Sequence, residues 1–293
     1  QSQREMIEAL ELSADAHLAI AQHCTSRDIR FLSTPFDHDS LELLTTALGM
    51  STIKIPSGEV TNLPFVLDIG RRAKDIILST GMCTMREIEL ALKVLAFAFD
   101  SSTTGRSPSR AELAAPLSDV ERSLLVGRVT VLQCTTEYPA PIEEANLRAM
   151  LAMRDAFGLA VGYSDHTLGS TAAITAVALG ASMIEKHFTL DKHQQGPDHR
   201  ASLEPDELKS YVRAIRDVTS SMGDGIKAPS TSEKKNIEIA RKSIVASRRI
   251  TKGEKFSADN LTFKRPGTGR QPIEYFELLA TTAERSYEED EQI

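Results

Sequence analysis

The segment AVGYSDHTLGS, residues 160–170, starts as an apolar run and ends in a cluster of polar side chains from Ser164 to Thr167. The same arrangement recurs between residues 28 and 190, each time followed by apolar residues at helical spacing. The runs are IRFLSTPF, STIKIPSGE, DIILSTGM, VTVLQCTTEYP, LAVGYSDHT and ASMIEKHFT. Near-continuous apolar runs are typical of strands that are covered on both faces, as in a parallel sheet. The repeat therefore predicts an α/β fold.

Two architectures could hold these six units: an open doubly wound sheet, or most of an eight-stranded (β/α)8 TIM barrel. No GxGxxG fingerprint opens any unit, which disfavours a dinucleotide-binding sheet. In a barrel, the carboxyl ends of all strands meet on one face and would gather the polar clusters into one site. We therefore expect a TIM barrel. Helices are expected at residues 39–48, 85–97, 141–157 and 170–179, several of them closed by glycine.

The regular repeat is interrupted once, at residues 99–127. Their Ser/Thr/Gly/Pro-rich start and later helical spacing predict a peripheral loop with one extra helix. After Met222 the pattern changes to short alternating segments with frequent turns, which indicates a small β-rich module. We expect a barrel domain over residues 1–222, a linker over 223–241 and a second domain over 242–293.

Composition narrows the class of protein. The 293 residues carry a net charge of -7 with acidic residues spread along the chain, which argues against a nucleic-acid partner. No apolar run is long enough to span a membrane. The three cysteines are far apart and form no CxxC pair, as expected of reduced thiols in a cytoplasmic protein.

His166 and His187 end successive predicted strands, so they would lie on neighbouring strands of a barrel. Two imidazoles, completed by water and a substrate oxygen, would make an open divalent-metal site. The alternative is that each histidine only satisfies local hydrogen bonds.

Hydroxyls and one lysine follow the predicted strands. Lys54, Ser57 and Glu59 lie together in IKIPSGE, and further hydroxyls come from Ser33, Thr34, Ser79, Thr80, Thr135, Thr136 and Ser164. Hydroxyls with a lysine suit a small ligand that carries phosphate and carboxylate. The alternative is helix capping, which also uses Ser and Thr at these positions.

Two further candidates lie in loops. Asp198, in QQGPDHRASLEPDEL, could hold sugar hydroxyls or act as a base, or it could belong to an ordinary surface loop. Arg265, in TFKRPGTG, lies on a rigid turn from which it could reach a polar ligand, although a solvated basic turn explains it equally.

At these motifs the sequence resembles the sialic acid synthase family, which includes N-acetylneuraminate, legionaminate and pseudaminate synthases. The resemblance runs nearly end to end, and GPDHRASLEP is more similar to the neuraminate and legionaminate branches. It implies a TIM barrel followed by an antifreeze-like (SAF) domain, and condensation of phosphoenolpyruvate with an N-acetylmannosamine-type sugar. The matching segments are FLSTPFD, KIPSGE, ILSTGM, CTTEYPAP, GYSDHT, EKHFTLDK, GPDHRASLEP, KSIVASRRITKGE and NLTFKRPGTG.

The resemblance also implies roles for residues. His166 and His187 would bind a divalent metal, expected to be Mn2+. Catalytic roles would fall to Lys54, Glu59 and Asp198. The phosphoenolpyruvate site would comprise Thr34, Lys54, Ser57, Ser79, Thr136 and Ser164. The sugar would be held by Glu59, Tyr138, Asp198 and Arg265, the last from the partner of a homodimer with swapped SAF domains.

The sequence departs from the family pattern in two respects. Thr136 stands where some relatives have asparagine, and the first two barrel strands are missing, so we expect upstream residues. Two other functions stay open: a different phosphoenolpyruvate-dependent aldol-type synthase, which would generally lack the SAF module, and a non-catalytic sugar-binding barrel.

Overall fold

The computed structural model describes residues 8 and 10–293, and the chain divides into two compact units, Gln1–Gly223 and Asp224–Ile293. In the first unit the described elements are α2 (Ala14–Ser26), α3 (His38–Glu42), η1 (Leu43–Ala47), β1 (Thr52–Ile55), η2 (Ser57–Glu59), α4 (Leu63–Arg72), β2 (Asp75–Ser79), α5 (Met85–Phe99), η3 (Ser101–Thr103), α6 (Arg110–Ala114), α7 (Asp119–Leu125), β3 (Val129–Cys134), η4 (Ile142–Glu144), α8 (Arg148–Phe157), β4 (Ala160–Asp165), α9 (Thr171–Ala178), β5 (Ile184–Lys186), η5 (His199–Ala201) and α10 (Pro205–Ser221).

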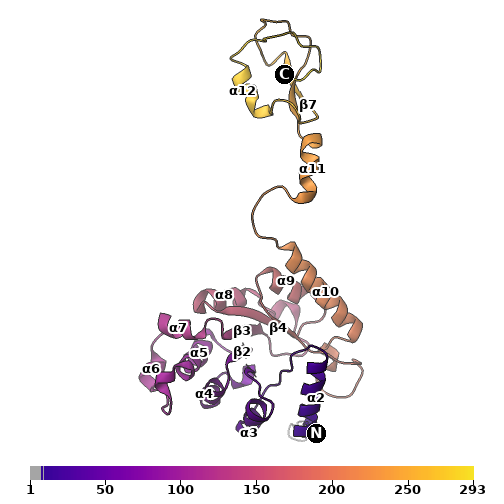
Figure 1. Ribbon diagram of the computed structural model, residues 1–293. Helices are drawn as coiled ribbons and strands as arrows, with labels where there is room; N and C mark the ends of the chain where they lie inside the picture. The colour runs from indigo at the N-terminus through magenta and orange to yellow at the C-terminus, as the bar shows by residue number, and fades with distance from the viewer. Residues whose placement is uncertain (1–7, 9) are drawn as a thin grey trace. The chain divides into compact units, whose positions relative to one another are not determined.

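The five strands of the first unit form one parallel sheet in the order β1-β2-β3-β4-β5. Sequential parallel strands need a crossover between each pair, and the helices supply it. In Figure 1, α3, α4, α5, α8 and α9 follow one another around the strands. The sheet is curled into a half-barrel, which confirms the predicted barrel-type α/β fold. The helices expected at 85–97 and 170–179 are present with small shifts at their ends, as α5 and α9. The segment expected at 39–48 divides into α3 and the π-helix η1, and the one at 141–157 into the 3-10 helix η4 and α8.

The first predicted strand, IRFLSTPF, is wrong. Residues 29–36 belong to no strand, and within the described residues β1 pairs only with β2. Several apolar side chains of this segment stay exposed, Ile29 at 63% and Phe36 at 65%, although Phe31 is half-buried and Pro35 is buried. An apolar run becomes a strand only when a neighbour pairs with its backbone, and here the described part of the chain offers none.

The core of the first unit lies between the sheet and its helices. Ile55, Leu78 and Val131 on the strands and Leu92 on α5 are fully buried. Leu132, which follows Val131 along β3 and therefore points to the opposite face of the sheet, is buried as well. Both faces of the sheet are thus covered, as the near-continuous apolar runs predict.

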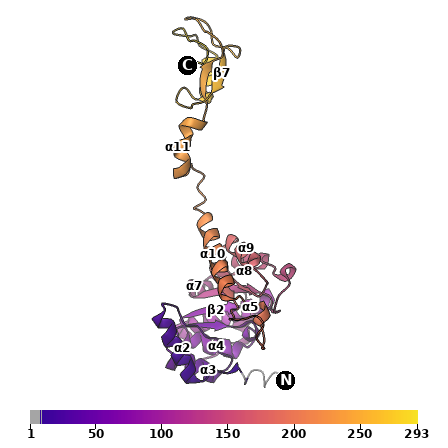
Figure 2. The ribbon, with the colours of Figure 1, turned by 90° about the vertical axis from the view of Figure 1, so that its right-hand side faces the viewer.

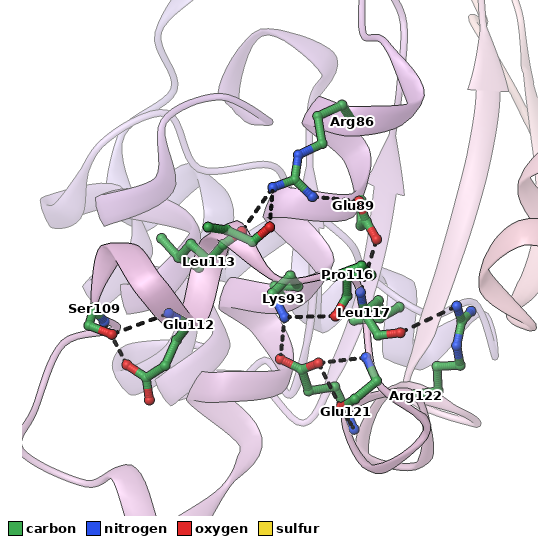
Figure 3. Close-up of polar contacts among 12 residues, drawn as sticks. Arg86, Glu89, Lys93, Ser109, Glu112, Leu113, Pro116, Leu117, Glu121 and Arg122 are labelled. Carbon is green, nitrogen blue, oxygen red and sulfur yellow. Dashed lines mark hydrogen bonds and ion pairs between the residues drawn. The ribbon is translucent and has the colours of Figure 1, made fainter.

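The interruption at residues 99–127 forms two short helices, α6 and α7, where one was expected. Both begin with a capping box, at Ser109–Glu112 and Ser118–Glu121. Figure 3 shows how this segment is attached to α5: Lys93 donates to Glu121 Oε1 at 2.7 Å and to the Pro116 carbonyl at 3.3 Å. The segment packs on the outer helices and contributes no strand end, as predicted for a peripheral insertion.

The second unit contains α11 (Thr231–Ala240), β6 (Ser243–Ala246), β7 (Leu261–Lys264), η6 (Pro272–Glu274) and α12 (Tyr275–Leu278). Strands β6 and β7 pair antiparallel around a small core that includes Ile244, Phe256 and Leu261. Figure 2 shows β7 within this unit. The β-rich module is therefore present. The expected linker is not entirely irregular, because Ser230 and Glu233 form a capping box that starts α11.

Among the described residues, no helix is both long and apolar enough to cross a membrane.

Candidate active site

The carboxyl ends of the parallel strands bring five polar side chains to one edge of the sheet. The strand register places Ile55 beside Leu78, Ser79 beside Leu132, Cys134 beside Ser164, and Ser164 beside Glu185. The polar side chains near these ends are Lys54, Ser79, Cys134, Ser164 and Glu185. Ligands of α/β sheets bind at this edge, so it is the candidate site.

Lys54, Ser164 and Glu185 form a connected polar group. The Lys54 ammonium lies 3.2 Å from Glu185 Oε1, and the Ser164 hydroxyl donates to the same oxygen at 2.7 Å. The Lys54 side chain is only 16% exposed, so its charge is largely shielded from water. The lysine is therefore held at a fixed point where it could meet an anionic ligand.

His166 and His187 lie next to each other, with ring centroids 5.2 Å apart. His166 Nδ1 is 2.7 Å from the Thr135 carbonyl, so this nitrogen carries the proton, and the lone pair is on Nε2, which lies 3.3 Å from the Ser164 hydroxyl. Burial lowers the pKa of His166, although the bond to Thr135 opposes the shift. The ring is therefore neutral near pH 7, which is the form that binds metal ions.

Tyr138 covers the two histidines. Its ring centroid lies 4.2 Å from that of His166 and 5.3 Å from that of His187. The peptide bond between Tyr138 and Pro139 is cis. Burial raises the pKa of Tyr138, so its hydroxyl keeps its proton and can donate to a ligand.

Asp198 lies in the loop after β5, next to His187. Its carboxylate Oδ2 lies 3.6 Å from His187 Nδ1. Together with Tyr138 it lines a cavity of about 830 Å³. The other lining residues are Lys192, His193, Gln194, Gln195, Gly196, His199 and Arg200. This polar cavity is large enough for a sugar.

Ser57 and Thr136 meet at Gly81, in the turn after β2. The Gly81 amide donates to Ser57 Oγ at 2.8 Å and to Cys134 Sγ at 3.1 Å. A Cβ on Gly81 would lie 2.2 Å from Thr136 Oγ1. The hydroxyls of Ser57 and Thr136 can therefore approach this backbone only because residue 81 is glycine. Threonine, although unexpected at 136, fits this packed turn.

Ser79, at the end of β2, is 2% exposed, and its hydroxyl is the one buried side-chain polar atom in the described part of the chain without a hydrogen-bond partner. A buried hydroxyl without a partner costs free energy unless a ligand or water completes it. This orphaned oxygen at the strand edge fits a ligand that accepts a hydrogen bond.

The remaining candidates are placed less centrally. Glu59 lies in η2 and accepts a hydrogen bond from Asn62 at 2.7 Å. Thr34, expected at a strand end, instead lies in the irregular segment before α3 and is partly buried. Arg265 belongs to the second unit, where its Nε donates to the Ala240 carbonyl at 2.9 Å.

Sequence reasoning missed Glu185 and Cys134. Both lie in motifs that the sequence analysis uses, EKHFT and CTTEYP. In these motifs His187 and Thr136 are the predicted site residues. The period of two along a strand could have found Glu185, because side chains two residues apart point to the same side and His187 was already placed.

The histidine pair supplies only part of a metal-binding shell. Among the described residues no three of the His, Cys, Asp and Glu side chains converge as a metal-binding group. The two adjacent histidines, one of them with a lone pair fixed by its other nitrogen, fit an open site in which water and substrate oxygens complete the shell.

Comparison with known proteins gives a consistent family for both units. Residues 1–227 match the NeuB family and residues 241–293 match the SAF domain. An N,N'-diacetyllegionaminic acid synthase from Campylobacter jejuni is 50% identical over 293 residues, covering 100% of this chain and 80% of that protein. A pseudaminic acid synthase from the same species is 33% identical, covering 97% of this chain and 75% of that protein.

Solved structures agree with these matches. The crystal structure of an N-acetylneuraminic acid synthetase from Leptospira borgpetersenii is 28% identical, with a TM-score of 0.65, covering 80% of this chain and 72% of that one.

Proposed function

Because the chain belongs to the NeuB family, we propose that it condenses phosphoenolpyruvate with an acylated mannosamine-type sugar to form a nine-carbon 2-keto acid and phosphate. The observation that carries this proposal is the meeting of a shielded lysine, an orphaned hydroxyl and two adjacent histidines at one edge of the sheet.

Phosphoenolpyruvate fits the polar group around Lys54. The lysine supplies the positive charge, and hydroxyls supply directed hydrogen bonds to phosphate and carboxylate oxygens. Ser79 gains the partner that its buried hydroxyl lacks. The other hydroxyls of the proposed site are those of Thr34, Ser57, Thr136 and Ser164.

The sugar fits the cavity beside Tyr138 and Asp198, where Glu59 and Arg265 remain further proposed contacts. C3 of phosphoenolpyruvate attacks the aldehyde carbon of the sugar, and positive charge develops at C2. Water then adds to C2 and loses a proton, which balances the proton that the aldehyde oxygen takes up. Phosphate leaves from this tetrahedral centre by cleavage of its C–O bond, and the C2 hydroxyl loses its proton to become the keto group. Asp198 and Lys54 would hold the reacting groups in line.

His166 and His187 would hold the divalent metal, for which we propose Mn2+. When bound, the metal supplies Lewis-acid polarisation of the sugar's aldehyde oxygen. The residues of this chain provide two adjacent imidazoles and the Tyr138 ring, which lies tilted against both of them.

We propose the 2,4-diacetamido-6-deoxy sugar of the legionaminic branch as the preferred acceptor. This rests on the higher identity to the legionaminic acid synthase than to the pseudaminic acid synthase. We also propose a cytoplasmic homodimer in which the SAF domain, with Arg265, completes the partner's site.

The test is phosphate release by the intact protein from phosphoenolpyruvate and Mn2+, with N-acetylmannosamine and the 2,4-diacetamido-6-deoxy analogue side by side. We expect faster release with the analogue, and loss of release with chelator. His187→Ala should abolish turnover, whereas the matched control His23→Ala, on the exposed side of α2, should not. Absence of release with every mannosamine derivative would favour the sugar-binding alternative.

A further inference from the structure

We propose that a buried ion pair between Asp165 and Lys186, completed by Tyr211 of α10, fixes the spacing of His166 and His187 and thereby sets their affinity for a divalent metal. The inference rests on the proposed metal role of the two histidines. The three residues form what we call the outer clamp: Asp165, Lys186 and Tyr211.

The outer clamp is buried and fully bonded. Asp165 is 0% exposed, Lys186 4% by side chain, and Tyr211 4%. Asp165 Oδ2 lies 3.3 Å from the Lys186 ammonium and accepts the Tyr211 hydroxyl at 2.8 Å. Asp165 Oδ1 accepts the amide of Thr167 at 2.9 Å and its hydroxyl at 2.7 Å. Lys186 also donates to the Thr167 carbonyl.

The bonds enclose both histidines along the chain. Asp165 precedes His166 and Thr167 follows it, while Lys186 precedes His187. The strand register pairs Asp165 with Lys186 directly. The residues on both sides of His166 are therefore bonded to Lys186, the residue before His187. Neither histidine can shift along the strand direction without breaking bonds to a buried carboxylate.

Alternation along the strands explains why the clamp lies behind the site. Side chains two residues apart share a side, so Ser164 and His166 point together, and their polar atoms lie 3.3 Å apart. Asp165 and Lys186 point to the opposite side, where Tyr211 packs with Leu203 and Ala173. The outer clamp thus touches no proposed substrate group and acts through the histidines.

The energetics of the Asp165–Lys186 pair favour a role in positioning the histidines over a role in stabilising the fold. A buried ion pair gains little net stability over an apolar pair of similar volume, because both charges lose their water. What it provides is direction, since each hydrogen bond fixes an angle as well as a distance. Partners that orient metal ligands commonly change metal affinity by about 10- to 100-fold when removed.

The test removes one hydroxyl and keeps its ring. Tyr211→Phe leaves the packing with Leu203 intact and deprives Asp165 of one donor. Binding of Mn2+ to the intact protein is measured by electron paramagnetic resonance of the free ion, together with the melting temperature. We expect the Mn2+ dissociation constant to rise by about tenfold.

The matched control is Leu208→Ala on the same helix, because Leu208 packs against the same apolar cluster but makes no bond to Asp165. It should lower the melting temperature at least as much as Tyr211→Phe without changing Mn2+ affinity. Unchanged affinity in Tyr211→Phe, or an equal loss in Leu208→Ala, refutes the clamp alone. A wild-type protein that binds no Mn2+ refutes the metal role in the proposed function and the clamp with it.

Discussion

Gly81 is the residue on which the phosphoenolpyruvate side of the site depends most. A methyl group there would lie 2.2 Å from Thr136 Oγ1, 2.9 Å from Cys134 Sγ and 3.0 Å from Ser57 Oγ. We expect Gly81→Ala to push both hydroxyls aside, raising KM for phosphoenolpyruvate about tenfold and lowering stability by about 1–3 kcal/mol. Steady-state kinetics and thermal unfolding would measure the two effects.

The control for this substitution is Gly58→Ala, since a Cβ at Gly58 meets no atom within 4 Å although it follows Ser57 directly. Its KM should stay at the wild-type value. Similar kinetics for the two variants would show that the close packing around Gly81 has no effect on the ligand.

The thiol of Cys83 gives a second prediction, from pH. Burial raises the pKa of Cys83 to about 11, with smaller contributions from Glu87 and Cys134. Only the thiolate reacts with iodoacetamide, so alkylation of Cys83 in the folded protein should accelerate about tenfold per pH unit between about pH 8 and pH 10. Mass spectrometry of the Cys83 peptide measures the rate.

In denaturant the same thiol should behave as an ordinary cysteine, with a pKa of about 8.5, and its rate should level off above about pH 9. A folded-state rate that also levels off near that pH would contradict the buried environment of Cys83.

At the residue scale, sequence reasoning found side chains whose chemistry is unusual for their position. His166, His187 and Lys54 were picked as polar groups that end apolar runs, and the structure does bring the two histidines side by side. Glu185 is not identified from the sequence, and Asp165 is identified only as a member of the polar cluster at 164–167, without a role. A carboxylate in a sequence carries no sign of whether its partner is water or a buried lysine. That information lies in the strand register.

At the element scale, the fold was predictable where local pattern and pairing agree. The five runs that became strands each have a neighbour in the sheet. The run at 29–36 has a similar apolar-to-polar pattern but no neighbouring strand in the described residues, and such a pattern alone cannot supply one. Helix α11 is not predicted from the sequence, because its apolar residues have only weak helical spacing within a polar linker. Its capping box, Ser230 and Glu233, is the sequence signal that could have indicated it.

The insertion with α6 and α7 yields a prediction about stability. The Lys93 side chain is 3% exposed and pairs with Glu121, whose side chain is 26% exposed. Burial alone would raise the pKa of Glu121, but the bonds from Lys93 and from Ser118 outweigh it and hold the pKa below its ordinary 4.5. Glu121→Gln should therefore lower stability at pH 7 by about 1–3 kcal/mol, since it removes the negative partner of the buried lysine and leaves the Pro116 carbonyl as its remaining contact.

The pH dependence has a definite sign. A carboxylate with a depressed pKa stabilises the fold above its unfolded-state pKa, and this contribution is lost as the pH falls through the folded-state value. The melting temperature of Glu121→Gln should thus lie below that of the wild type by the largest amount at pH 7. This difference should become smaller below about pH 4.5. Glu112→Gln serves as control and should cost less at pH 7, because its partner Arg106 is exposed. A difference for Glu121→Gln that grows in acid would contradict the pairing.

At the scale of the whole molecule, the chain combines two units with separate cores, one around the parallel sheet and one around β6 and β7. Each unit carries part of the proposed sugar site: Tyr138 and Asp198 in the first, Arg265 in the second. The family resemblance implies that both units serve one reaction. The sequence cannot indicate which copy of the chain would supply Arg265, because that depends on assembly rather than on local pattern.

The swapped dimer proposed above predicts complementation between two inactive variants. Arg265→Ala leaves the histidine pair intact, and His187→Ala leaves Arg265 intact. In a swapped heterodimer one site receives both defects and the other receives none, so a randomly mixed pool should recover about a quarter of wild-type activity. If each site were built from a single chain, every site would carry one defect. Phosphate release after co-expression would then stay at the level of the separate variants.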